Sequence, residues 1–405
     1  MTATITFHMN RILFSPQVSV GSALATAVST ACLLFAAGSD AAAQSRARTE
    51  LQFPDLPGLV TLKCDFHIHT VFSDGSVWPT VRVEEAWRDG LDAIAMTDHI
   101  EYQPHGVDVS TNYGRSFTLA ATAARPLGLL VIRAGEITRG EPPGHLNALF
   151  LTNIAALRTN DTVLRTNDFR EAVKAAIEQG AFVFWNHPGW KQTNHQAVWY
   201  AEQGELYDRG WLRGIEIVNG PDYEAGPHQW CLDKKLTMLA NSDVHGPIGW
   251  DYNLAAGEHR PLTLVLAKSK TEAAIKEALF ARQTVVYSAG QLIGDEAFLR
   301  PLFLQSLEVK SGPARLKAKT KTLIQLFNRS PVAFRLEPAG KVPEVSLPKT
   351  VVLQPGRTSI LELTGTTNRL SGSRVLSLPF RVTNLKTGPE TSLQVQLPVT
   401  VEPAS

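Results

Sequence analysis

The sequence is poor in cysteine, and its positive and negative charges nearly cancel. Only 3 cysteines occur in 405 residues, which excludes a fold held together mainly by disulfide bonds. The formal net charge of +1 gives no basis for nucleic-acid binding through overall positive charge, and we expect none. A hydrophobic fraction of 44% with 19% charged residues excludes disorder throughout and indicates a globular protein of two or three domains.

The last quarter of the chain lacks most side chains that carry out catalysis. Residues 301–405 contain no His, Cys, Asp, Trp, Tyr or Met, but 14 Lys and Arg against 6 Glu, a net charge of +8. Residues 1–43 contain one charge of each sign, so the total of +1 leaves −7 for residues 44–300. We therefore expect a structural role for residues 301–405, or a docking or oligomer contact through their basic surface.

The N-terminal segment is nearly free of charge. Residues 21–38 are almost all apolar or small, and Ala41 and Ala43 occupy the −3 and −1 positions of a cut before Gln44. This pattern predicts a secretory signal over residues 1–43, and hence a periplasmic or secreted bacterial protein. A membrane anchor is the alternative, but the strongly apolar stretch is short for the ~20 residues that span a bilayer. We expect no transmembrane segment in the mature chain.

Two cysteines, Cys64 and Cys231, remain after this cut. Export would permit a disulfide bond between them. Both lie in apolar strand-like or helix-like surroundings, so we predict two buried thiols instead.

Residues ~57–295 alternate between strand-like and helix-like segments. The expected strands are Leu59–Phe66, Ala93–Met96, Leu129–Arg133, Ala181–Trp185, Gly214–Val218, Leu236–Leu239 and Leu262–Leu266. The expected helices are Thr80–Asp89, Asp168–Gln179, Tyr223–Lys235 and Thr271–Ala281. Repeated β-then-α order predicts a parallel α/β architecture, either a barrel or a doubly wound sheet.

From residue ~303 onward, short alternating runs are separated by Pro, Gly and Asn turns. These runs are Thr322–Phe327, Val332–Leu336, Ser359–Leu363, Val375–Val382 and Leu393–Val401. The pattern is typical of a small antiparallel β-sandwich, and we place the boundary between the two domains at residues 300 and 301.

Histidines and carboxylates follow five of the expected strands. His67 and His69 end the first strand, where residues two apart project from the same face and can bind one ion. Four later strands are followed by His99, by Glu136, by His187, and by Asp243 with His245, while Asp74 and His145 lie in nearby turns. Because the carboxyl ends of parallel strands meet on one face, the sequence predicts that these groups converge on a metal site.

The motifs that carry these residues resemble, in order, those of the polymerase and histidinol phosphatase (PHP) family. They are Asp65-Phe66-His67-Ile68-His69-Thr70, Ser73-Asp74-Gly75, Thr97-Asp98-His99, Gly135-Glu136, Gly144-His145, Asn186-His187-Pro188 and Ser242-Asp243-Val244-His245. The resemblance spans residues ~61–290. It implies a distorted seven-stranded, TIM-like β/α barrel that binds two or three divalent metal ions.

Carried over residue by residue, the resemblance implies three sites. The first ion would be held by His67, His69, Glu136 and Asp243. The second would be held by Glu136, His145 and His187, with Glu136 bridging, and the third by Asp74, His99 and His245. Some family members have a histidine where this chain has Asp74, which puts the third ion in doubt. Imidazole and carboxylate ligands suit Zn²⁺, Mn²⁺, Fe²⁺ or Co²⁺, and the sequence does not choose among them.

This ligand set predicts a metal-dependent phosphoric ester hydrolase. Two ions ~3.5–4 Å apart can hold a bridging hydroxide for attack on phosphorus, and Asp243 can accept the proton. The exported organophosphate phosphodiesterases of the family resemble this chain, so we predict a phosphodiesterase acting on a small-molecule phosphate ester. A phosphomonoesterase or broad phosphatase is the alternative within the family, and a non-catalytic metal-binding protein is the alternative outside it.

The sequence gives weaker support for functional roles of other residues near the motifs. Asp98 is either an acceptor that orients His67 or His99, or the cap of a loop. Three arginines are candidate phosphate ligands, and three tryptophans are candidate walls of a pocket for an apolar ester group: Arg133, Arg139, Arg260, Trp185, Trp190 and Trp250. Four histidines have no ligand-like partner in the sequence: His105, His195, His228 and His259.

Overall fold

The computed structural model of the protein describes residues 47–158, 169–368 and 372–404. The predicted secretory signal, residues 1–43, lies outside the described residues. Among those that are described, no helix has the length and apolar character needed to cross a bilayer. Cys64 and Cys231 are both free and buried, which confirms the prediction of two buried thiols.

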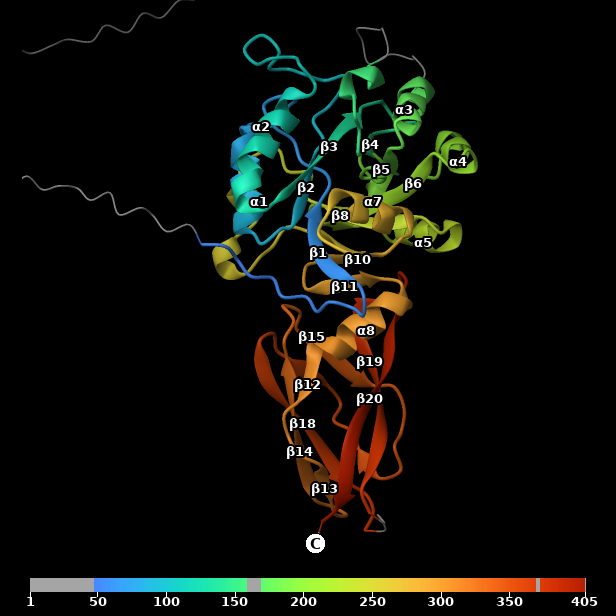
Figure 1. Ribbon diagram of the computed structural model, residues 1–405. Coiled ribbons are helices and arrows are strands. Elements are labelled where there is room, and N and C mark those ends of the chain that lie inside the picture. The colour runs from blue at the N-terminus through green and yellow to red at the C-terminus, as the bar shows by residue number, and fades with distance from the viewer. Residues whose placement is uncertain (1–46, 159–168, 369–371, 405) are drawn as a thin grey trace, which may run out of the picture. The chain divides into compact units, whose positions relative to one another are not determined.

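The first domain contains strands and helices in alternation (Figure 1). Its strands are β1 (Val60–Asp65), β2 (Ala93–Met96), β3 (Leu130–Ile137), β4 (Leu146–Leu149), β5 (Phe182–Trp185), β6 (Leu212–Asn219), β7 (Asp222–Tyr223), β8 (Thr237–Asn241), β9 (Leu262–Ala267), β10 (Thr284–Ser288) and β11 (Gln291–Gly294). Its helices are α1 (Pro79–Arg88), α2 (Arg115–Ala124), α3 (Phe169–Glu178), α4 (Ala201–Asp208), α5 (Ala225–Lys234), α6 (Ile248–Asp251), α7 (Glu272–Phe280) and α8 (Glu296–Ser306).

Parallel strand pairs form the centre of this domain, a distorted barrel of the predicted kind. β1, β2 and β3 pair in parallel, as do β5, β6 and β8. The ring closes just beyond β1 and β8, where the N–H of Asp243 donates to the carbonyl of His67 and the N–H of His69 donates to that of Val244. The two segments richest in predicted ligands are therefore hydrogen-bonded neighbours.

Two strands do not follow the parallel order that the sequence predicted. β4 runs antiparallel to both β3 and β5, and β9 runs antiparallel to β1. The connection between β3 and β4, residues 138–145, is shorter than the dozen or so residues of a crossover. Since the chain must turn back on itself there, the expectation of a wholly parallel sheet was wrong at this point.

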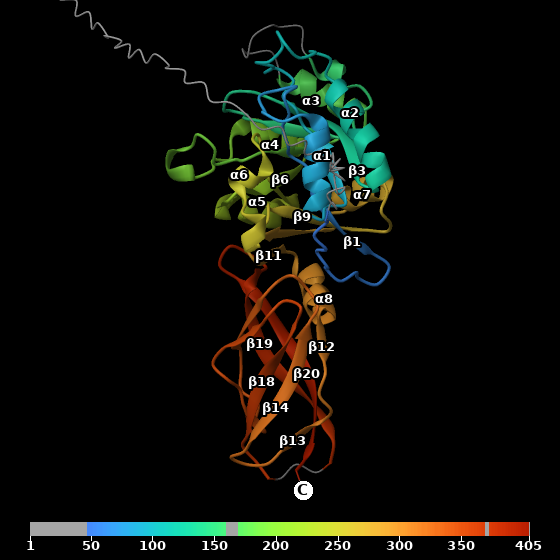
Figure 2. The same cartoon turned by 90° about the vertical axis from the view of Figure 1, so that its left-hand side faces the viewer.

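The second domain is a mainly antiparallel β-sandwich, as predicted. Its strands are β12 (Leu307–Val309), β13 (Ala314–Leu316), β14 (Lys321–Asn328), β15 (Phe334–Pro338), β16 (Val345–Ser346), β17 (Val351–Leu353), β18 (Arg357–Gly365), β19 (Arg374–Lys386) and β20 (Ser392–Pro403). One sheet has the order β12-β14-β18-β16, and the other joins β13, β20, β19, β15 and β17. The long strands β19 and β20 run side by side in both views (Figures 1 and 2).

Alternating burial along these strands explains the sandwich. In β20 every second side chain is buried, from Leu393 through Val401, and the residues between them are exposed. A strand with one buried face packs that face against the opposite sheet and leaves the other face to solvent.

The two domains are joined by continuous structure. α8 runs through the predicted boundary at residues 300 and 301, and β11 pairs in parallel with β19. Phe303 of α8 packs edge-on against Phe334 of β15, with ring centroids 5.0 Å apart, and both rings are fully buried.

Candidate metal centre

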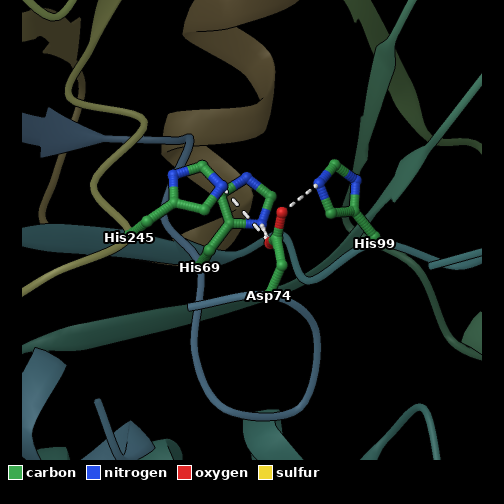
Figure 3. Close-up of side chains that lie close together, drawn as sticks. All are labelled: His69, Asp74, His99 and His245. Atoms are coloured by element: carbon green, nitrogen blue, oxygen red, sulfur yellow. Dashed lines mark ion pairs between the residues drawn. The ribbon is translucent and has the colours of Figure 1, made fainter. Parts of the chain in front are cut away.

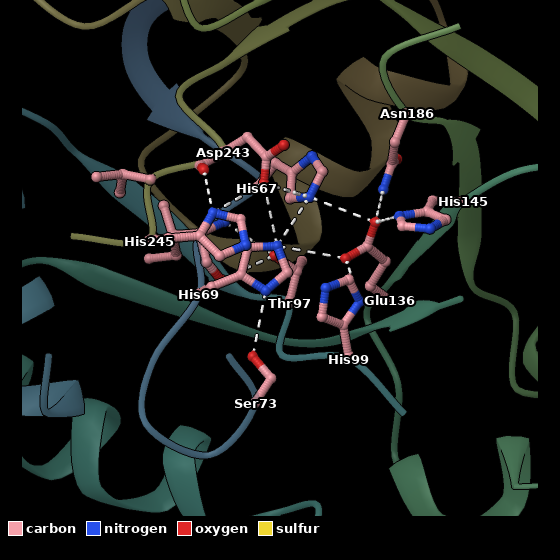
Figure 4. A network of polar contacts seen from close by, with 12 residues as sticks. His67, His69, Ser73, Thr97, His99, Glu136, His145, Asn186, Asp243 and His245 are labelled. Atoms are coloured by element: carbon pink, nitrogen blue, oxygen red, sulfur yellow. Dashed lines mark hydrogen bonds and ion pairs between the residues drawn. The ribbon is translucent and has the colours of Figure 1, made fainter. Parts of the chain in front are cut away.

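The structure brings all nine predicted ligands together at one end of the barrel strands. Figure 4 labels them except Asp74 and His187. His67 and His69 follow β1, His99 follows β2, and His187 follows β5. Glu136 is the only one inside a strand, β3, while His145 directly precedes β4. Asp243 and His245 follow β8, and Asp74 reaches the same place from the turn after His69. Short strands thus deliver each ligand from rigid backbone.

Five of these residues form what we call the inner cluster: His67, Glu136, His145, His187 and Asp243. The ring nitrogen Nε2 of His67 lies 3.1 Å from Asp243 Oδ1 and 3.5 Å from Glu136 Oε1. His145 Nδ1 lies 2.9 Å from the same Glu136 oxygen, and His187 Nε2 lies 3.8 Å from it. Several imidazole nitrogens therefore surround one fully buried carboxylate.

The other four residues form the outer cluster: His69, Asp74, His99 and His245 (Figure 3). Their ligand atoms all lie within 4.8 Å of one another. Asp74 lies between the rings, with Oδ1 3.2 Å from His245 Nε2 and Oδ2 3.4 Å from His99 Nε2. His69 also joins the two clusters, because its Nε2 lies 3.1 Å from Asp243 Oδ1.

Asp74 reaches the outer cluster because the chain turns tightly after His69. The N–H groups of Ser73 and Gly75 both donate to the carbonyl of Thr70. A Cβ atom at Gly75 would lie 2.7 Å from the backbone of His69 and Thr70, a distance that no side chain tolerates. Only glycine permits this close approach.

Both clusters contain carboxylate oxygens that fit a bound cation. One oxygen each of Asp74, Glu136 and Asp243 is buried and accepts no hydrogen bond. All three face imidazole nitrogens, which can serve them as N–H donors or share a metal ion with them. A buried oxygen without a partner is costly, and hard divalent cations satisfy such oxygens together with imidazole nitrogens. The donor set therefore fits the metal ions that the sequence predicted.

The protonation states of the ligands differ across the site. Burial opposes the charge on four imidazoles, but nearby carboxylates outweigh it and raise the pKa of each, so a metal ion must displace their protons: His67, His99, His187 and His245. Burial, with the imidazoles of His99 and His245, lowers the pKa of His69 to about 4, so its ring is neutral and free to bind a cation at pH 7. Burial opposes the charge on Asp243, but the imidazoles of His67 and His69 outweigh it and hold the pKa of this carboxyl below its usual range. The site thus presents ionised oxygens beside a neutral nitrogen ligand.

A cavity of about 500 Å³ opens directly in front of both clusters. Side chains that are not metal ligands complete its wall, from the loops that also carry His99, His145 and His187: Tyr102, Thr138, Arg139, Trp190 and Lys191. The indole of Trp190 lies against two ligands, with ring centroids 5.0 Å from His145 and 5.1 Å from His187. The ligands are therefore accessible to a molecule much larger than water.

Comparison with solved structures identifies the family of the chain. A two-domain protein from Bacteroides vulgatus, containing a predicted PHP-like metal-dependent phosphoesterase, is 40% identical, with a TM-score of 0.80. The match covers 88% of this chain and 100% of that one. The chain belongs to the PHP-like metal-dependent phosphoesterases.

Further comparisons, with two solved structures, a domain model and curated sequences, complete this result. A solved metal-dependent phosphoesterase from Bifidobacterium adolescentis is 19% identical over 54% of this chain and 96% of that chain, with a TM-score of 0.37. PsfC from Pseudomonas syringae is 16% identical over 56% of this chain and 92% of that chain, with a TM-score of 0.38. Scores this low support no inference. An Ig-like domain model, DUF5001, matches residues 307–398, and no curated protein sequence matches the chain.

In this PHP-like phosphoesterase, a buried carboxylate that the sequence analysis missed supports the inner cluster. Glu216 of β6 lies with Oε1 2.8 Å from His67 Nδ1, and its Oε2 accepts from the N–H of His187 at 2.9 Å. Contact at Nδ1 leaves Nε2 of His67 to bind a metal. The sequence of β6 could have revealed it, since a lone Glu in a continuously buried apolar strand needs a partner.

Asp98 of the phosphoesterase caps a loop and does not orient His67 or His99. Its Oδ1 accepts from the N–H and the hydroxyl of Thr70, both at 2.8 Å, and from Ser73 Oγ at 3.0 Å. Ser73 Oγ in turn lies 3.2 Å from His69 Nδ1. The sequence allowed two interpretations of Asp98, and the structure shows the loop cap.

The candidate phosphate-binding arginines have other partners. Arg260 is fully buried and bonds to Asp89 and Asp65, while the Arg133 guanidinium donates to the carbonyl of Thr152. Arg139 does line the cavity, but its guanidinium is held by Glu101. These engaged guanidinium groups leave Lys191 as a cavity-lining cation without a carboxylate ion pair among the described residues.

The candidate tryptophans and histidines also differ in whether they lie at the site. Trp190 lines the cavity, whereas Trp185 is fully buried in the core and Trp250 is 77% exposed outside the cavity. No cluster of ligand atoms within the described residues includes His105, His228 or His259, and the side chain of His195 is outside the description. How His69 and His99 divide between the ions of the three predicted sites stays a prediction.

Proposed function

We propose that this phosphoesterase is an exported phosphodiesterase that acts on small-molecule phosphate diesters, organophosphate diesters among them. The observation that carries the proposal is the wide cavity over the metal ligands, with an exposed aromatic ring on its wall. A phosphate group alone would fill only a small part of about 500 Å³. The remaining space suits the two organic arms of a diester.

Two or three divalent ions are expected in the two clusters. When bound, they would supply a nucleophilic water at neutral pH and neutralise charge on the phosphoryl oxygens. Glu136 would hold ions on both sides, because its Oε1 faces His145 and its Oε2 lies 2.8 Å from His99 Nδ1. Its complete burial keeps this carboxylate dry and fixed in position.

Asp243 is suited to move the proton of the attacking water. Its side chain is 18% exposed, whereas that of Glu136 is fully buried, so Asp243 is the inner-cluster carboxylate with access to solvent. Asn219 Nδ2 donates to Asp243 Oδ2 at 3.3 Å and orients that oxygen. In this proposal Oδ2 accepts the proton from water and releases it to solvent.

The cavity wall suits a monoanion with apolar arms. Trp190 is 40% exposed and Tyr102 45% exposed, and Tyr102 lies with its ring centroid 6.0 Å from that of His99. Lys191 holds its ammonium 3.8 Å from the centroid of the Trp190 ring. A diester carries one negative charge and two organic groups, which this single unpaired cation and these aromatic rings complement.

A phosphomonoesterase is the second candidate, and the outer cluster favours it. An ion held by Asp74 and three imidazoles would add positive charge beside the reacting group, which suits a dianionic ester.

A paired assay separates the candidates. The protein is loaded with Mn²⁺ or Zn²⁺, its metal content is measured, and bis(4-nitrophenyl) phosphate is compared with 4-nitrophenyl phosphate. We expect the diester to have the higher kcat/KM. The reverse order would establish the monoesterase. Turnover of neither ester at full metal content would leave a non-catalytic metal-binding protein, and hydrolysis of 4-nitrophenyl acetate alone would indicate a carboxylesterase.

Export is a separate part of the proposal and has its own test. The protein would be expressed with its N-terminal segment in a Gram-negative bacterium, and the periplasmic fraction would be analysed by N-terminal sequencing. We expect Gln44 as the first residue. Recovery of the uncut chain in the cytoplasm would refute the secretory signal.

A further inference from the structure

A buried arginine that is not a metal ligand contacts both segments of the outer cluster. Arg82 lies on α1, and its side chain is fully buried. An unpaired guanidinium would be very costly at such a place, so its partners indicate what it does.

All five N–H donors of Arg82 are used, which is the full capacity of a guanidinium. Nε donates to the carbonyl of His69 at 2.8 Å. The two terminal nitrogens donate to three further carbonyls and one carboxylate: Val244 at 3.0 Å, His245 at 2.7 Å, Gly246 at 2.7 Å and Glu85 Oε2 at 2.8 Å.

These acceptors belong to the two segments that carry outer-cluster histidines. The His69 carbonyl follows β1, and the other three carbonyls lie in the loop after β8. Glu85, one turn along α1, extends the contact, because its Oε1 accepts from the N–H of Ile248 at 2.8 Å. The α1 helix thus holds two loops that are far apart in sequence.

The loop after β8 needs such support. Among the described residues, its backbone beyond Val244 is contacted by the Ser76 N–H, which donates to the His245 carbonyl at 2.9 Å, and by Arg82, and the His245 side chain is 40% exposed. The His245 ring is fixed locally by contact of Nδ1 with the Asp243 carbonyl at 2.8 Å, which leaves Nε2 directed at Asp74. This ring can meet Asp74 and His69 only while its backbone stays in place.

We propose that Arg82 is the positioning residue of the outer cluster, because its guanidinium fixes the backbone that carries His69 and His245. Lysine at this position keeps the charge but has three donors, so at least two of the five hydrogen bonds would be lost. The proposal rests on metal binding at the outer cluster and is independent of the substrate.

A double-mutant cycle on metal affinity tests the proposal. Zn²⁺ dissociation constants are measured by chelator competition for the wild type, Arg82→Lys, His245→Ala and the double variant. Supporting groups of this kind change metal affinity by about 10- to 100-fold. We expect Arg82→Lys to weaken one ion at least tenfold. The further loss in the His245→Ala background should be clearly smaller, because only the contact with the His69 carbonyl then supports a ligand.

Two additional variants keep the test independent of folding. Ile275→Ala removes a fully buried side chain of α7 that belongs to a hydrophobic core cluster, and should lower the Tm without changing metal affinity. Glu85→Gln leaves the guanidinium in place and should weaken the binding of the same ion by a smaller factor. This variant replaces Arg82→Lys in the test if Arg82→Lys does not fold.

Three results would overturn the proposal: unchanged Zn²⁺ affinity in the Arg82 variant, additive losses in the double variant, or an equal loss in Ile275→Ala. A protein that binds the ions as expected and hydrolyses no diester would contradict only the proposed function.

Discussion

At the scale of single residues, the clusters centre on Glu136, which is fully buried among the rings of His67, His99 and His145. Glu136→Gln keeps the shape of the side chain and removes its charge. We expect a loss of bound metal and a fall in kcat of about 100-fold or more, because a neutral amide oxygen is a weak ligand. Metal analysis and steady-state kinetics check this. Near-normal activity at full metal content would contradict the assignment.

Trp190 is the residue through which the cavity is expected to select its substrate. Trp190→Ala removes an exposed indole from the wall without touching a hydrogen bond to a ligand, so KM for an aryl diester should rise about tenfold while metal content stays constant. Trp211→Ala, a control at the amino end of β6, should leave KM unchanged. Equal KM values in both variants would show that the indole does not contact the substrate.

At the scale of elements, the tight turn after β1 sets the outer cluster. Gly75→Ala forces a Cβ to within 2.7 Å of the backbone of His69 and Thr70, so the turn must open and Asp74 must move. We expect this variant to lose the outer ion and to keep the inner ones, as measured by metal titration. Gly312→Ala, at an open position, is the matched control. Unchanged stoichiometry in Gly75→Ala would show that Asp74 needs no such turn.

Periodicity and strand ends made much of this arrangement predictable. The predicted strand Ala93–Met96 is β2, and the ends of β1, β5 and β8 lie close to their predicted positions, because each strand is a short apolar run. Strand direction was not predictable for β4 and β9, since apolar runs look alike in parallel and antiparallel sheets. The helices α2, α4, α6 and α8 also went unpredicted.

The residues that support the ligands could not be predicted from the sequence, for a different reason. Arg82 and Glu216 become significant only through carbonyls and imidazoles more than a hundred positions away in sequence. A charged residue in a helix or strand gives no sign of such distant partners. Metal ligands can be predicted from their positions after strands. The residues that hold those ligands in place can be recognised only in the folded chain.

At the scale of the whole molecule, the two domains share a sheet and a core. Removing residues 307–405 would expose Leu292 and Phe303, which are at most 2% exposed and pack in one cluster with the second domain. Each such side chain contributes about 1.5–3 kcal/mol, so we expect the Tm of the truncated chain to fall by more than about 10 °C. All nine metal ligands precede the cut, so the fraction that folds should bind metal. An unchanged Tm would show that the domains are energetically independent.

A buried histidine at the domain junction should make stability depend on pH. Burial, with nearby Lys386, lowers the pKa of His228 to about 4, while an unfolded histidine titrates near ~6.5. The unfolded chain therefore binds the proton first, so this contribution is complete above about pH 6.5 and is lost as the pH falls toward 4. The Tm difference between wild type and His228→Asn should shrink over that range. A constant difference would contradict the shift.

The most direct test of the central claim is anomalous diffraction at the metal absorption edge, from crystals of the protein grown with Mn²⁺ or Zn²⁺. The account predicts two or three peaks between the nine side chains of the inner and outer clusters, with Glu136 in contact with more than one of them. Peaks elsewhere, or rings that point away from an empty centre, would contradict it.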